Sequence, residues 1–115
     1  MASSVDRIFE RRLAAVVNSR EQRLLVGGRR GLERESLRVT PDARITRSPQ
    51  PAAFGSALTN PHITTDYSEA LLELVTPTFN DNAALMQYLT DLHHFVYHHL
   101  GDELLWAASM SFFLV

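Results

Sequence analysis

The chain has 115 residues, no cysteine and a formal charge of −2 at neutral pH, so it forms one domain or part of one, without a disulfide framework or a thiolate metal site. A charge this close to zero gives no electrostatic basis for binding nucleic acid. No apolar segment approaches the ~18 residues of a membrane span, and the N-terminus lacks the apolar core of a signal peptide, so we expect a cytoplasmic protein without a membrane partner.

The first predicted element is an amphipathic helix at residues 5–19. Its apolar residues recur every three or four positions and share one helical face: Phe9, Leu13, Val16 and Val17. Ser3 or Ser4 can cap the start, and the negative charge of Asp6 suits the positive N-terminal end of a helix. We expect a structural role for this helix.

Residues 31–39 have the alternating pattern of a β-strand. Glu33, Glu35, Leu37 and Val39 then share one face, and neither face of the strand is cleanly apolar. Two interpretations stay open. The segment is either a surface strand with cross-strand Glu–Arg pairs or a strand that lines a polar cavity.

Residues 40–59 are predicted to form a loop. Pro41 and Asp42 start a turn, and the later prolines Pro49 and Pro51 interrupt regular structure. Gly55 allows another part of the chain to approach the backbone closely. A loop of this length inside a compact domain is often functional.

Residues 62–79 place three carboxylates, Asp66, Glu69 and Glu73, in an apolar and β-prone segment. Burying an unpaired carboxylate is costly, so a cation or a strong set of hydrogen-bond donors is implied nearby. The spacing of the three acids fits one face of a helix, whereas the β-branched residues before Pro77 favour a strand. We predict a strand from about Glu69, with Asp66 in the loop before it.

Residues 81–100 are the clearest predicted helix. The apolar stripe has helical spacing: Leu85, Leu89, Leu92, Val96 and Leu100. Asn80 or Asp81 can cap its start, and Gly101 ends it. His94 and His98 have the spacing of a two-histidine metal site on a helix. They form either an exposed histidine face or part of a zinc site.

The chain ends in an apolar, strand-like run at residues 106–115. Complete domains rarely finish in this way, because an unpaired apolar strand is an aggregation hazard. We therefore expect the polypeptide to be the front part of something longer.

Several segments resemble one known family in a single register: Gly31-Leu32-Glu33-Arg34-Glu35, then Gly55-Ser56-Ala57-Leu58-Thr59, then Ile63-Thr64-Thr65-Asp66-Tyr67-Ser68-Glu69-Ala70-Leu71-Leu72-Glu73. Asp91-Leu92-His93 and Gly101-Asp102-Glu103 continue the same order. From about residue 30 to residue 110 the chain resembles the bacterial glutamate–cysteine ligases, or γ-glutamylcysteine synthetases. It departs from them at Asn60, where many relatives have histidine, and at Ala107 and Ser111, which replace prolines.

The resemblance implies an α+β fold, an antiparallel sheet with flanking helices that is part of a glutamine-synthetase-like catalytic fold. Residues 1–115 would be a single domain, the N-terminal portion of a longer ligase catalytic domain, with the helix at 81–100 inside it. In the implied reaction ATP phosphorylates the γ-carboxylate of L-glutamate, and the amine of L-cysteine attacks the acyl phosphate. The product, γ-glutamylcysteine, is the first intermediate of glutathione synthesis. The partners would be glutamate, cysteine and ATP, with Mg²⁺ as cofactor.

The resemblance also implies residue roles by position. The implied Mg²⁺ ligands are Glu33, Glu35, Asp66 and Glu73. Mg²⁺ takes hard oxygen ligands and usually bridges phosphates, so these carboxylates would hold the metals that link ATP to the glutamate γ-carboxylate. Glu69 would lie outside the coordination shell. The implied substrate pocket includes Tyr67, Gly55, Ser56 and Thr59, and no catalytic residue is assigned.

We predict that these 115 residues do not catalyse the ligation alone, because ligands from two strands cannot enclose a nucleotide. Two alternatives remain. One is a non-catalytic remnant or interaction module whose exposed sheet edge pairs with itself or with a partner. The other is a zinc-binding protein built on the histidines of residues 81–100.

Overall fold

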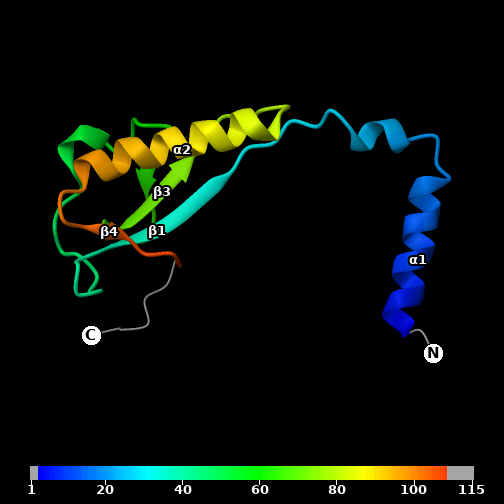
Figure 1. The fold of residues 1–115 in the computed structure, drawn as a ribbon, viewed down its shortest axis with the longest axis horizontal. Helices are drawn as coiled ribbons and strands as arrows, with labels where there is room; N and C mark the ends of the chain where they lie inside the picture. The colour runs from blue at the N-terminus through cyan, green and yellow to red at the C-terminus, as the bar shows by residue number, and fades with distance from the viewer. Residues whose placement is uncertain (1–2, 109–115) are drawn as a thin grey trace.

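The computed structural model describes residues 3–108, which form a four-stranded antiparallel sheet, one helix that packs on it and one helix that stands away from it (Figure 1). The helices are α1 (Ser4–Val17) and α2 (Asn82–His99), and the strands are β1 (Glu33–Val39), β2 (Ile63–Thr65), β3 (Leu71–Val75) and β4 (Leu104–Leu105). Short 3-10 helices occupy Gln22–Leu25 and Ala52–Phe54. The expected α+β class is confirmed. No helix in the described part of the chain is long and apolar enough to cross a membrane.

The strands lie in the order β2-β3-β1-β4, and every neighbouring pair is antiparallel. In this register Glu35 of β1 lies opposite Glu73 of β3, and Thr64 of β2 lies on the other side of Glu73. The strand predicted from Glu69 begins two residues later, at Leu71. The short strand β2 was not predicted, and the helical interpretation of residues 62–79 is wrong.

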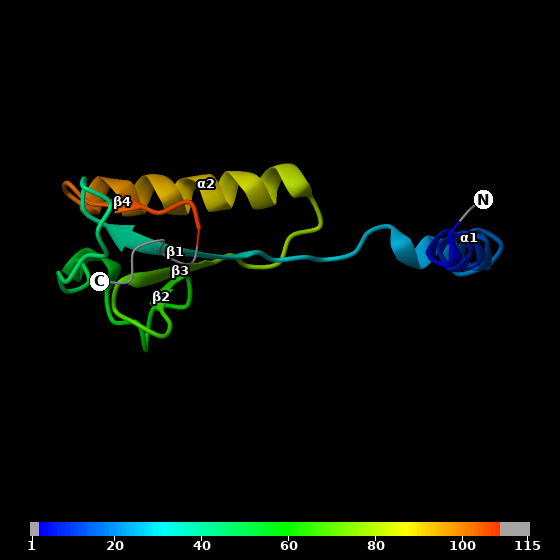
Figure 2. The ribbon, with the colours of Figure 1, turned by 90° about the horizontal axis from the view of Figure 1, so that it is seen from below.

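α2 covers one face of the sheet, as Figure 2 shows from below. Cross-strand partners share a face, so Leu72 and Leu74 of β3 point with Ile63 of β2 toward this helix. They form a core with its buried residues Leu89 and Val96. Each fully buried aliphatic side chain stabilises the fold by about 1.5–3 kcal/mol. Because this core occupies one face of the sheet, the residues of β1 and β3 that α2 leaves uncovered are those on the opposite face.

The opposite face carries a smaller apolar cluster at one end. Leu37, Val39 and Leu71 are buried there, with Ile45 and Trp106 packed against them. Toward the other end of the same face the apolar residues give way to carboxylates. The face of the sheet that α2 does not cover is therefore apolar at one end and acidic at the other.

The predicted helix at 81–100 agrees with α2 to within one residue at each end. The side chain of Asp81 accepts a hydrogen bond from the Ala84 amide at 2.9 Å and caps the helix. Gly101 follows with φ of 63°, a left-handed conformation that ends a helix at little cost for glycine. The predicted apolar stripe is the buried side of α2.

The predicted helix at 5–19 agrees with α1, and Ser3 caps it. The Ser3 hydroxyl accepts from the Asp6 amide at 3.1 Å, while the Asp6 carboxylate accepts from the Ser3 amide at 2.7 Å. No residue of α1 is buried, and Phe9 in its apolar face is 64% exposed. Among the described residues, the apolar face has no packing partner, and α1 stands apart from the sheet in Figure 1.

The predicted loop at residues 40–59 is more ordered than expected. It begins with a turn in which the Thr40 amide donates to the Arg44 carbonyl at 2.8 Å, and Val39 then bridges to Ile45. It ends in the 3-10 helix that buries Phe54 against Phe95 of α2. Most of the apolar run predicted at 106–115 lies outside the described residues. The strand found near it, β4, covers only Leu104–Leu105.

Candidate metal and substrate site

The sheet register brings carboxylates from two strands to one face. Glu35 and Glu73 are directly opposite each other, and Glu33 lies two residues before Glu35 on the same side of β1. This is the face that α2 does not cover. Like charges directly opposite in an antiparallel pair are destabilising, so the arrangement is unfavourable unless a cation or donor compensates it.

The electrostatics of Glu73 reflect this crowding. Burial raises the pKa of its carboxyl above the ordinary value, and the carboxylates of Glu33, Asp66 and Glu35 raise it further. Asp66 therefore contributes to the same field although it lies in the turn between β2 and β3, where it was predicted. Four acidic side chains from three segments act on one small region.

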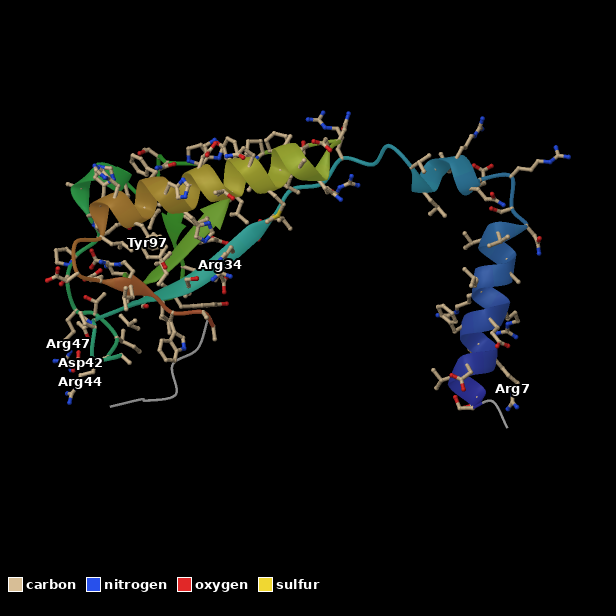
Figure 3. All side chains as sticks on the ribbon, viewed as in Figure 1. Arg7, Arg34, Asp42, Arg44, Arg47 and Tyr97 are labelled. Atoms are coloured by element: carbon tan, nitrogen blue, oxygen red, sulfur yellow. The ribbon has the colours of Figure 1, made fainter. Side chains whose placement is uncertain are left out.

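The interpretation of β1 as a surface strand is wrong, because its second half, Ser36–Val39, is buried. Arg34 lies opposite Leu74, on the face that α2 covers, and is half-buried. Figure 3 shows Arg34 on β1, well separated from Asp42, Arg44 and Arg47, which gather at the turn after the strand. Within residues 3–108 the ion pairs are Arg38 with Glu103 and Arg44 with Asp42, and neither involves the acidic face.

The carboxylates share a face but do not form a closed coordination shell. No group of three or more acidic or histidine side chains in the described part of the chain is arranged to hold a metal ion. Their chemistry nevertheless fits Mg²⁺, which takes hard oxygen ligands and commonly uses one or two carboxylates together with water and phosphate oxygens. In the described part of the chain these carboxylates form one open acidic face.

A hollow in the described structure lies beside these carboxylates. It has a volume of about 650 Å³. Its lining combines the start of β1 with the residue before it, one residue of α2 and the segment after β4: Leu32, Glu33, Arg34, Glu35, Leu89, Ala107 and Ala108. Two of the four predicted metal ligands therefore border a space large enough for a small molecule.

The predicted substrate loop is attached to the edge of the sheet next to the acids. Thr64, which neighbours Glu73, donates through its hydroxyl to the Ala57 carbonyl at 3.1 Å. Asn60 donates to the Phe54 carbonyl at 2.7 Å and accepts from the His62 amide at 2.9 Å. Asn60 therefore holds the loop against the start of β2.

Individual residues of the predicted pocket differ in their placement. Ser56 and Thr59 form the turn of this loop, with the Thr59 amide donating to the Ser56 carbonyl at 2.9 Å. Gly55 has φ of 72°, and a Cβ there would meet nothing within 4 Å. Its glycine is explained by backbone conformation, and the predicted close approach is wrong. Tyr67 is 94% exposed beside Asp66.

The other candidate groups lie elsewhere. The Glu69 carboxylate accepts from the Gln50 amide at 2.9 Å and so faces the loop after β1. His94 and His98 are exposed on α2, whereas the Nδ1 atoms of His93 and His99 each lie 2.8 Å from a backbone carbonyl oxygen of the preceding helical turn. Nothing in the described part of the chain adds a third ligand to the two exposed histidines.

One polar cluster was missed by the sequence analysis. Arg38 is 1% exposed and its guanidinium lies 2.8 Å from the Glu103 carboxylate. The Thr46 hydroxyl donates to the other oxygen of Glu103. An arginine in an alternating strand next to turns does not by itself indicate burial, because arginine is usually exposed. Only the pairing of β1 with β4 brings Glu103 to it.

The chain is similar to a defined family. The family model described as glutamate-cysteine ligase matches residues 13–115. The glutamate–cysteine ligase of Alcanivorax borkumensis is 50% identical over 102 residues, which are 89% of this chain and 19% of that protein. The ligase of Pseudomonas putida is 56% identical over 80 residues, or 70% of this chain and 15% of that protein. The chain thus spans about a fifth of the length of these curated relatives.

Solved structures give the same picture. A glutamate–cysteine ligase from Francisella tularensis in complex with AMP matches with a TM-score of 0.72 and 37% identity, over 75% of this chain and 18% of that one. A bifunctional glutathione synthetase from Pasteurella multocida matches with a TM-score of 0.69 and 38% identity, over 74% and 12%. The sheet and its helix are therefore shared with much longer chains.

Proposed function

This chain belongs to the glutamate–cysteine ligase family, and we propose that it supplies one wall of the site in which such a ligase joins glutamate to cysteine at the expense of ATP. The observation that carries the proposal is the register that sets Glu35 opposite Glu73 on the face left open by α2. The reaction would be the first step of glutathione synthesis and would take place in the cytoplasm.

The chemistry explains why an acidic wall is useful. Phosphorylating the γ-carboxylate of glutamate brings two anions together, so catalysis depends on positioning and on charge neutralisation. Mg²⁺, when bound, supplies positive charge to the phosphoryl oxygens. Glu33, Glu35 and Glu73 would present oxygen ligands from the sheet, and Asp66 would add one from the turn. A bound cation would offset the carboxylate repulsion that contributes to the raised pKa of Glu73.

The remaining predicted residues would serve the amino-acid substrates. The turn of Ser56 and Thr59 is anchored next to Thr64, which is the cross-strand neighbour of Glu73. Gly55 gives that turn its left-handed entry. Tyr67 follows Asp66 and projects into solvent, where a substrate could contact its ring. We propose these residues as the rim of the pocket rather than its floor.

We propose that residues 1–115 act as a single unit of a longer catalytic domain and do not turn over alone. The acidic wall comes from two strands and one turn. The hollow lined by Glu33 and Glu35 is open to solvent. The cited relatives match this chain over only 19% and 15% of their length. We propose that the corresponding remainder of the ligase completes the enclosure. ATP and the second amino acid would therefore be bound largely by groups outside these residues.

The test is a chimera that is compared with the isolated chain. Residues 13–115 of this chain replace the matching segment of the Alcanivorax borkumensis ligase, and ATP-dependent formation of γ-glutamylcysteine is measured by mass spectrometry. We expect activity from the chimera, none from the isolated chain, and a loss of at least about a hundredfold in chimeras with Glu35→Gln or Glu73→Gln, the order of magnitude of a lost electrostatic contact to the transition state.

Glu21→Gln is the matched control, because Glu21 is an exposed carboxylate remote from the sheet. That chimera should keep the full rate. A folded chimera without activity, or one whose rate is unchanged by both Glu35→Gln and Glu73→Gln, would contradict the proposal. Turnover by the isolated chain would contradict the claim that it is incomplete.

A further inference from the structure

We infer that Arg38 is a positioning residue, which sets the location of Asp66 and Glu73 relative to the carboxylates of β1. The inference rests on the proposed function, because it concerns the same acidic wall. Arg38 lies on the strand that carries Glu33 and Glu35, but its side chain reaches Glu69, in the turn between Asp66 and the strand that carries Glu73.

The surroundings of Arg38 join four parts of the chain. Its Nη1 atom donates to the Glu103 carboxylate at 2.8 Å. Its Nη2 atom donates to the Ser48 carbonyl at 2.9 Å and to the Glu69 carbonyl at 3.1 Å. One buried guanidinium therefore binds β1 to the loop after it, to the turn before β3 and to the segment before β4.

The contact with the Glu69 carbonyl is the one that bears on the positions of Asp66 and Glu73. The Arg38 amide also donates to the Ala70 carbonyl at 2.8 Å, and the Leu71 amide donates to the Ser68 carbonyl at 3.0 Å. These bonds hold the backbone of residues 68–71 in place, and this segment lies between Asp66 and Glu73 in the sequence. Fixing this turn fixes both the start of β3 and the end of the segment that presents Asp66.

Arginine suits this role better than another cation. Its planar fork donates in several fixed directions at once, whereas lysine offers a flexible point charge. The charge is balanced by Glu103, which also accepts from the Thr46 hydroxyl. Removing one partner would leave a buried unpaired charge, while neutralising both costs less. A double substitution can therefore remove the positioning contacts without the full penalty of an isolated charge.

The experiment compares Arg38→Met/Glu103→Gln with the unmodified chain and with Val96→Ala. Val96 is a fully buried residue of α2 in the core on the opposite side of the sheet from the acids, so its truncation serves as a control for lost stability. Three quantities are measured: the urea midpoint, the affinity for Mn²⁺ by electron paramagnetic resonance, and the hydrogen exchange of the Leu71 amide.

We expect the double variant to bind Mn²⁺ about tenfold or more weakly, which is the effect typical of groups that orient metal ligands. The Leu71 amide should exchange faster. Val96→Ala should lower the urea midpoint but keep the Mn²⁺ affinity within about twofold, because Val96 makes no hydrogen bond to the turn of residues 68–71 through its side chain. Any faster exchange of the Leu71 amide in Val96→Ala should be no larger than its loss of stability explains. Unchanged Mn²⁺ affinity in the double variant, or an equal loss in Val96→Ala, would overturn the inference.

The two proposals can fail separately. If the unmodified chain binds no Mn²⁺ at the acidic face, the metal-binding function fails. The inference on Arg38 is then tested only by the hydrogen exchange and chemical shifts of the turn between β2 and β3. Faster exchange at Leu71 together with shifted resonances of Asp66 in the double variant supports it, and an unchanged turn overturns it.

Discussion

Glu73 is the residue of the acidic face on which burial and the repulsion from the other carboxylates act together. It is half-buried, faces Glu35 across the ladder, and has its pKa raised first by burial and then by the surrounding carboxylates. An isolated domain would be more stable with a neutral residue there. The loss of stability caused by this repulsion has an explanation if the Glu73 carboxylate binds a cation.

We predict that Glu73→Gln stabilises the metal-free chain at neutral pH, by on the order of 0.5 kcal/mol. The raised pKa means that the folded state binds the proton more tightly than the unfolded chain does. The favourable contribution of protonated Glu73 is therefore fully present below the usual pKa of glutamate and is lost as the pH rises through the raised value. The advantage of Glu73→Gln should vanish in acid.

Urea denaturation at neutral pH and in acid measures both parts of this prediction. Glu10→Gln in α1 is the control, because Glu10 is exposed and lies on the helix that stands away from the sheet. Lower stability of Glu73→Gln at neutral pH, or a gain of the same size from Glu10→Gln, would count against the account.

Single residues also show how far sequence reasoning reaches. The alternation of β1 correctly placed Glu33 and Glu35 on one face, because strand periodicity is local. The register that sets Glu35 opposite Glu73 is a long-range property, and the sequence between the strands does not specify it. Arg38 was missed for the same reason, since its partner Glu103 is 65 positions away.

The two helices differ in what holds them. α2 was predictable because its apolar stripe, its Asp81 cap and its glycine stop all agree, and it packs on the sheet. α1 has equally clear local signals but no buried residue. Periodicity correctly indicated its structure and could not indicate whether its apolar face is covered. β2 was missed because a strand of three residues leaves little pattern to detect.

Since α1 lacks buried packing, its stability should depend on its cap. We predict that Ser3→Ala destabilises α1 by about 1 kcal/mol, because the Asp6 amide loses its acceptor. The Cα chemical shifts of residues 4–17 should move toward random-coil values while those of the sheet stay unchanged.

Ser4→Ala is the matched control for this change. Ser4 is the first residue of the helix rather than its cap, so alanine there should keep the helical shifts. If Ser3→Ala leaves the shifts of α1 unchanged, or if it unfolds the sheet as well, then α1 is held by something other than its capping box.

In residues 3–108 the only helix packed on the sheet covers one of its two faces (Figure 2). α2 covers one face of the sheet, and the other face holds an apolar cluster beside four acidic residues. Domains are normally built from packed layers around a core, so a sheet with one covered face needs a further layer. The chain corresponds to about a fifth of its curated relatives, and we propose that the remainder of such a ligase provides that layer.

This proposal also separates the ligase from the histidine alternative. The acidic face and the exposed pair His94 and His98 belong to different sides of the molecule, because the histidines lie on α2 and the acids lie on the face that α2 leaves open. A cation that binds to one of them should therefore affect a different set of backbone amides from a cation that binds to the other.

The measurement that tests the central claim most directly is paramagnetic line broadening by Mn²⁺ in the isotopically labelled 115-residue chain, with excess Mg²⁺ added afterwards. We predict that broadening concentrates on the amides of Glu33, Glu35, Asp66 and Glu73 and that Mg²⁺ reverses it. Broadening centred on His94 and His98, or none at the acidic face of a folded chain, would contradict it.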